Sequence, residues 1–133
     1  TKKAGIEVHG NFILGLPIET PEKARIMVRN ICKMPFDYVK FNVLTPFPGT
    51  VLYRELNDGK WGTYGENRDK STCHHVTFVP YGYKSIDELD KLRRWGTKQF
   101  YIRPRYIFNR IISMRTTEDI KRNVKGFKAV AGL

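Results

Sequence analysis

The sequence predicts an α/β fold in which a partial parallel βαβ unit is followed by a helical, basic C-terminal extension. Three observations predict it. Two apolar runs lie about thirty residues apart and both stop at proline, helical spacing fills the interval between them, and the end of the chain combines helix caps with excess positive charge. We therefore divide the 133 residues into an α/β part over 1–59, a connecting loop with a short strand over 60–84, and a helical basic extension over 85–133.

The α/β part begins with a strand over residues 6–16, whose apolar run suits a strand covered on both faces. Thr20 is the expected N-cap of a helix over 21–33, in which apolar residues recur at helical spacing. A second strand follows over 38–45, and a short helix over 51–57. Strand, helix and strand in so short a span predict a βαβ unit with parallel strands.

The rest of the chain reads as a polar loop over residues 60–75, a short strand over 75–79, and helices. A capping box at Ser85 starts a helix over 86–101, and Pro104 starts a second one. Thr116 or Thr117 caps a third helix, in which the apolar residues Ile120, Val124 and Phe127 share a face.

The formal net charge of +11 is concentrated at the C-terminal end. Residues 1–90 carry 12 Lys/Arg and 11 Asp/Glu, whereas residues 91–133 carry 12 Lys/Arg against only Glu118 and Asp119. This excess of positive charge favours binding to an anionic membrane surface or to a nucleic acid. Aromatic side chains in the same segment would stack on the bases of a nucleic acid. A solvated basic helix without a partner explains the same pattern.

The two cysteines provide neither a disulfide framework nor a C-x-x-C pair. Cys32 lies on the apolar face of the first helix and is expected in the core. Cys73 stands beside His74 and His75, and we interpret it as a loop cysteine, so no metal site is expected. No signal peptide and no apolar stretch of membrane-spanning length is visible, and a cytoplasmic location is predicted.

Polar residues interrupt the strands near their carboxyl ends, where sites of α/β folds lie. Asn11 is in the first strand and Asn42 in the second. A buried amide needs partners, so the two asparagines bond either to each other or to a polar ligand. Glu19, at the entrance to the first helix, is interpreted as a favourable charge at a helix N-terminus.

Residues 5–56 contain "GIEVHGNFILGLPIETPE" and then "DYVKFNVLTPFPGTVLY". Together these segments resemble the C-terminal half of the radical S-adenosylmethionine (radical SAM) barrel, a TIM-like barrel whose last two strands end in such motifs. The tail, with "FYIRPRYIFNRI", resembles the cobalamin-binding class of that superfamily, which includes methyltransferases.

This resemblance implies S-adenosylmethionine, a [4Fe–4S] cluster and cobalamin as cofactors of the parent enzyme, an oxidoreductase or methyltransferase acting on a small-molecule or lipid-like substrate. It implies that residues on the two strand ends line the cofactor and substrate pocket: Asn11, Ile13, Gly15, Leu16, Asn42, Leu44, Thr45 and Pro46. It names no catalytic residue.

The cluster motif C-x3-C-x2-C of that family is absent, and two cysteines cannot supply three thiolates. The resemblance therefore implies a C-terminal fragment, inactive alone, whose partner is the upstream part of the same barrel. The alternative function is a basic module that binds nucleic acid or a membrane surface through residues 91–133.

Overall fold

In a computed structural model, residues 4–64 and 78–113 are described, together with residues 118, 121, 124 and 126. The elements in chain order are β1 (His9–Leu14), α1 (Pro21–Lys33), β2 (Tyr38–Val43), α2 (Val51–Asn57), β3 (Gly62–Tyr64), β4 (Phe78–Pro80), α3 (Ile86–Tyr101) and α4 (Pro104–Ser113). The α/β prediction is confirmed: these residues form a parallel sheet, an antiparallel sheet and helices.

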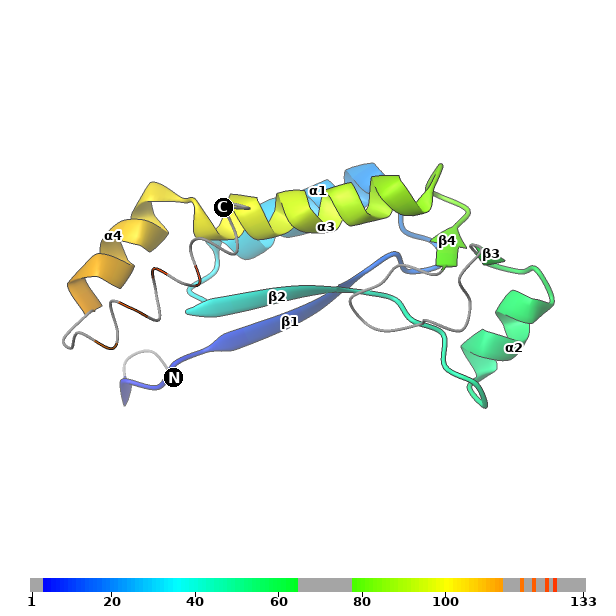
Figure 1. Ribbon diagram of the computed structural model, residues 1–133, viewed down its shortest axis with the longest axis horizontal. Coiled ribbons are helices and arrows are strands. Elements are labelled where there is room, and N and C mark those ends of the chain that lie inside the picture. Colours follow the sequence, from blue (N-terminus) through cyan, green and yellow to red (C-terminus); the bar gives the residue numbers. More distant parts are fainter. Residues whose placement is uncertain are drawn as a thin grey trace.

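The predicted βαβ unit forms as a parallel β1–β2 pair connected through α1 (Figure 1). The Thr20 hydroxyl accepts a hydrogen bond from the Lys23 amide and caps α1, and proline occupies the first turn, as the sequence indicates. Thr50 caps α2 and Ser85 caps α3 in the same way. Local sequence signals therefore determine where these three helices begin.

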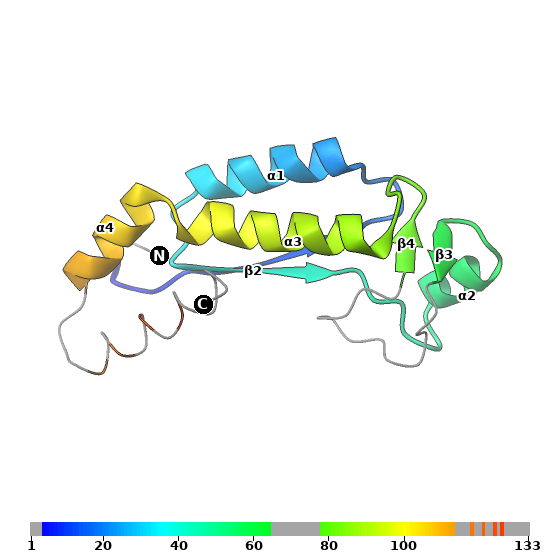
Figure 2. The same cartoon turned by 45° about the horizontal axis from the view of Figure 1, so that its top comes forward.

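Helices α1 and α3 run side by side over one face of the β1–β2 sheet (Figures 1 and 2). Alternate strand residues point toward the helices because side chains of a strand alternate between its faces. The resulting core joins both strands, both helices and Tyr83, which precedes α3. It consists of Leu14, Ala24, Val28, Ile31, Val39, Phe41, Val43, Tyr83, Leu89, Leu92 and Phe100. The helix expected to open the C-terminal extension thus shares one core with the βαβ unit, while the three-part division of the chain stays a prediction.

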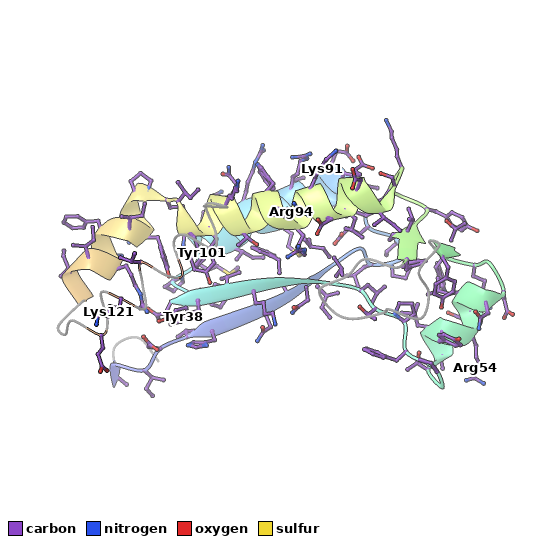
Figure 3. The ribbon with its side chains drawn as sticks, in the orientation of Figure 1. Tyr38, Arg54, Lys91, Arg94, Tyr101 and Lys121 are labelled. Atoms are coloured by element: carbon purple, nitrogen blue, oxygen red, sulfur yellow. The ribbon has the colours of Figure 1, made fainter. Side chains whose placement is uncertain are left out.

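Two tyrosines cover the amino-terminal part of the outer edge of β2. The Tyr101 hydroxyl accepts a hydrogen bond from the Val39 amide at 3.1 Å and donates one to the Val39 carbonyl at 2.8 Å. Figure 3 shows Tyr101 at the end of α3 above the start of β2. The Tyr106 hydroxyl donates to the Asp37 carbonyl at 3.1 Å. Backbone groups that a further strand would otherwise satisfy are bonded to side chains here.

Other expectations differ from the structure in extent. The first strand is shorter than residues 6–16, and β3 lies inside the segment expected to be a loop, where it pairs antiparallel with β4. Residues 65–77 lie outside the described part of the chain. The remainder of the strand expected over 75–79 belongs to β4 (Phe78–Pro80). Most of the helix expected after Thr117 and the group at Cys73 also lie outside it.

Candidate functional site

The face of the β1–β2 sheet opposite the helices has no element packed on it among the described residues (Figure 1). On this face Asn11 pairs with Lys40, and Ile13 pairs with Asn42, in the parallel register. Asn11, Ile13 and Lys40 are exposed, and Ile13 keeps 48% of its surface accessible. A polar, uncovered face is unusual for a parallel sheet, whose two faces are normally both covered.

Asn42 differs from its neighbours on this face in that its side-chain oxygen is buried. Its Oδ1 atom is buried, yet it has no hydrogen-bond partner among the described residues. The first alternative for the two asparagines, a bond between them, therefore does not form. An unsatisfied buried amide oxygen costs about 1–3 kcal/mol, so the position marks a place where a ligand donor would be favourable.

The two strand ends are joined directly. The Leu44 amide donates to the Leu14 carbonyl at 2.8 Å, and the Thr45 hydroxyl donates to the Val43 carbonyl at 3.3 Å. Leu44 and Thr45 are half-buried, whereas Pro46 is buried. The carboxyl ends of β1 and β2 therefore form one continuous edge.

The alternation of β1 ends at Gly15, where the backbone turns. Gly15 has a φ of 81°, which glycine adopts without strain, and a Cβ atom there would lie 2.8 Å from Leu89 Cδ2. Gly15 thus packs against α3 rather than lying on the uncovered face. Leu16, which alternation places on the helix side, is 43% exposed instead.

Glu19 holds this turn in place. Its side chain is buried, with 7% of the residue exposed, and Oε1 accepts hydrogen bonds from the Gly15 amide at 2.7 Å and from the Tyr83 hydroxyl at 2.5 Å. The interpretation of Glu19 as a charge at a helix N-terminus missed this role. Tyr83 lies 64 residues away in the sequence, so no local pattern could have indicated the contact.

Burial, reinforced by the hydrogen bond to Glu19, raises the pKa of Tyr83 well above its ordinary value of 10.0. Tyr83 therefore remains a neutral donor to the carboxylate at any physiological pH. Together, Glu19 and Tyr83 fasten the exit of β1 to the segment that leads into α3.

We expect the free energy of unfolding to fall as the pH rises above about 10. The unfolded chain releases the Tyr83 proton near its ordinary pKa, whereas the folded chain retains it, so stability present below that pH is lost above it. Urea unfolding followed by circular dichroism between about pH 8 and pH 11 measures this. Tyr83→Phe should flatten part of the alkaline decline, and an unchanged slope would contradict the assignment.

Of the two cysteines, the structure describes Cys32, whereas Cys73 lies outside the described residues. Cys32 packs against the core, as expected, and burial raises the pKa of its thiol. In residues 4–64 and 78–113, and at the four further described positions, no three His, Cys, Asp or Glu side chains gather as metal ligands. Among the same residues, no helix combines the length and hydropathy needed to cross a bilayer.

Comparisons with known proteins point to methyltransferases. No protein-family model matches the chain. A protein of Pyrococcus horikoshii named as an uncharacterized methyltransferase is 29% identical over 135 residues, which cover 97% of this chain and 28% of that protein. The bacteriochlorophyllide d C-8(2)-methyltransferase of Chlorobaculum tepidum is 25% identical over 138 residues, 96% of this chain and 30% of that enzyme. The C-12(1)-methyltransferase of the same organism is 28% identical over 99 residues, 69% of this chain and 20% of that enzyme.

These findings correct the family assignment. Residues 5–56 indicated the C-terminal half of a radical SAM barrel, and the tail indicated its cobalamin-binding class. That assignment is wrong, because the proteins similar over nearly the whole chain are named as methyltransferases. The chain is similar to methyltransferases, and it spans about three tenths of the length of the first two relatives.

Proposed function

We propose that these 133 residues are the pocket-lining part of a longer methyltransferase that uses S-adenosylmethionine as its methyl donor, and that they are inactive alone. Similarity to two proteins named as methyltransferases over 96–97% of the chain supports the activity class. The share of those relatives that the chain spans, 28–30%, supports a contribution to a larger enzyme.

The observation that carries the proposal is the buried, unpartnered Oδ1 of Asn42 on the uncovered face of the sheet. This atom accepts a hydrogen bond from the ligand, such as one from the adenine or amino group of S-adenosylmethionine or from the methyl acceptor. Ile13 lies beside Asn42 in the register and offers apolar surface to the adenine ring. Asn11 lies two residues before Ile13 on the same face of β1 and provides a second polar contact.

The strand ends form the rim of this pocket. Leu16 presents an exposed side chain there, and Leu44 and Thr45 are half-buried on the adjoining strand. Gly15 and Pro46 are buried beneath them and shape the rim through the backbone. S-adenosylmethionine supplies the methyl group when it is bound; the residues of this chain bind it, orient it and exclude water.

The remainder of the enzyme, upstream in the same polypeptide, covers the open face. In the described residues β2 is bonded at its outer edge by Tyr101, whereas no strand pairs with the outer edge of β1. An additional strand therefore pairs with the outer edge of β1 and extends the parallel sheet. Other elements of the longer enzyme then cover the polar face and enclose the pocket.

Asn42→Leu tests the pocket because it separates binding from stability. Leucine has a similar volume and removes the unsatisfied oxygen, so the free energy of unfolding should stay the same or rise by about 1 kcal/mol. Binding of S-adenosylmethionine or transfer of its methyl group by the complete polypeptide should fall at least about tenfold, as expected for one lost hydrogen bond to a buried group. Calorimetric titration and a radiolabelled methyl-transfer assay measure the two quantities.

The matched control is Asn30→Leu, the same substitution at an exposed position of α1. It should leave binding and methyl transfer unchanged. If the complete polypeptide does not bind S-adenosylmethionine, the proposed activity is wrong. If it binds and Asn42→Leu alters neither quantity, the enzyme class stands and the pocket lies elsewhere.

A further inference from the structure

The most apolar side of α4 points away from the protein. Phe108, Ile111 and Ile112 follow helical spacing, so they form one stripe, and they are 65%, 60% and 65% exposed. The helix lies at the end of the molecule opposite α2, β3 and β4, far from the carboxyl ends of the strands (Figures 1 and 2). This surface is therefore separate from the candidate pocket.

The opposite side of α4 is fixed against the sheet by polar and aromatic contacts. The Tyr106 hydroxyl donates to the Asp37 carbonyl, the Arg110 guanidinium lies 4.5 Å from the centre of the Tyr38 ring, and Arg110 pairs with Glu7 at 3.5 Å. Because these contacts hold one side of α4 against the protein, the apolar stripe on the other side faces outward. Contiguous exposed apolar residues mark an interaction surface, whereas single scattered ones do not.

The charges around the stripe select the partner. Residues 91–113 contain seven Lys/Arg and no Asp/Glu. Lys98 and Arg105 are exposed and form no ion pair with another described residue. Arg105 precedes Phe108 by three positions on α4 and so flanks the stripe, and Lys98 is near the C-terminal end of α3, the helix before it. An apolar stripe flanked by a cation on a positively charged segment is the pattern of a helix that lies in the interface of an anionic bilayer.

The aromatic side chains argue against nucleic acid as the partner. Phe100 is fully buried, and Tyr101 and Tyr106 use their hydroxyls on the backbone next to β2. Only Phe108 on α4 is exposed for stacking among these residues. A surface that binds single-stranded nucleic acid needs several exposed aromatic faces.

We propose that α4 docks the protein on an anionic phospholipid membrane surface, with Phe108, Ile111 and Ile112 inserted among the acyl chains near the headgroups. Lys98 and Arg105 face the lipid phosphates. The helix has 10 residues and lies along the membrane rather than across it. In this orientation α4 lies on the bilayer, and the carboxyl ends of β1 and β2, with the candidate pocket, lie away from it.

The test is flotation of the full chain with vesicles of phosphatidylcholine, either alone or mixed with phosphatidylglycerol. We expect binding to the mixed vesicles only, weakened by added salt. Phe108→Ser with Ile112→Ser should reduce partitioning at least about tenfold, since both side chains lose their insertion energy. Lys98→Gln and Arg105→Gln should each reduce it about fivefold.

The matched control is Ile26→Ser with Val51→Ser, which removes two apolar side chains that are 56% and 60% exposed on other helices. It should leave flotation unchanged. Absence of binding to anionic vesicles, or equal loss in the control, would overturn the proposal. A Phe108→Ser/Ile112→Ser variant that turns a dimer into a monomer, with no vesicle binding by either form, would show that a second copy covers the stripe instead. Salt-sensitive binding to RNA without vesicle binding would identify nucleic acid.

Discussion

Glu19→Ala is expected to lower the free energy of unfolding by about 2–4 kcal/mol, because it leaves two buried donors without an acceptor. These donors are the Gly15 amide and the Tyr83 hydroxyl, both of which bond to Glu19 Oε1. Water cannot replace the carboxylate without opening the packing between the β1 exit and the start of α3. Chemical denaturation with urea measures the change.

The substitution should also weaken S-adenosylmethionine binding by the complete polypeptide, since the turn at Gly15 forms the rim of the candidate pocket. Glu19→Gln retains an acceptor oxygen and should cost less than half as much. Glu22→Ala removes an exposed carboxylate from the first turn of α1 and should cost less than about 1 kcal/mol. Equal effects at Glu19 and Glu22 would show that Glu19 acts only as a helix-terminal charge.

Phe100→Ala is expected to have the largest effect on stability, about 3–5 kcal/mol. Phe100 is fully buried, and its ring lies 5.1 Å from that of Tyr101 and 5.3 Å from that of Tyr106, centre to centre. The Arg103 guanidinium lies 4.1 Å from the centre of the same ring. Removing the ring leaves a cavity at the junction of α3, α4 and β2.

The exposed Phe108 provides the matched control for this prediction. Phe108→Ala should change the free energy of unfolding by less than about 0.5 kcal/mol, since the side chain loses no internal packing. Urea unfolding of both variants tests the contrast. If the two substitutions cost the same, then either Phe100 is not in the core or Phe108 is covered by another part of the chain.

The two phenylalanines also connect stability to the proposed membrane docking. A Phe100 variant that remains folded should keep vesicle binding if α4 keeps its orientation, and it should lose binding in proportion to any displacement of α4. The Phe108 variant should lose binding while remaining stable. These opposite patterns separate a surface role from a structural one.

Much of the fold could be predicted from local signals. The bounds of α1, α2 and α3 agree with the expected ranges, because caps at Thr20, Thr50 and Ser85 and prolines act within a few residues of the helix start. The two parallel strands also lie within the expected segments. Both strands are shorter than expected, because the apolar residues continue into turns where the hydrogen bonds between the strands have ended.

The candidate site could be predicted less completely. The alternation along β1 placed Asn11 and Ile13 on one face, as observed, because the period of a strand is local. Continued by two residues, the same alternation would place Gly15 with them, whereas in the structure Gly15 packs against Leu89. The sequence resemblance led to the wrong family assignment, since short motifs at strand ends are shared more widely than one chemistry.

The sequence alone determined the α/β class, the helix starts, the placement of polar residues on one side of the strands and the concentration of positive charge near the C-terminus. Only the tertiary structure decided that α3 belongs to the same core as the βαβ unit, that Glu19 bonds to Tyr83, and that the apolar side of α4 faces outward. The physical reason is range. Caps and alternation act between near neighbours, whereas burial and the partner of each polar group depend on residues brought together from distant parts of the chain.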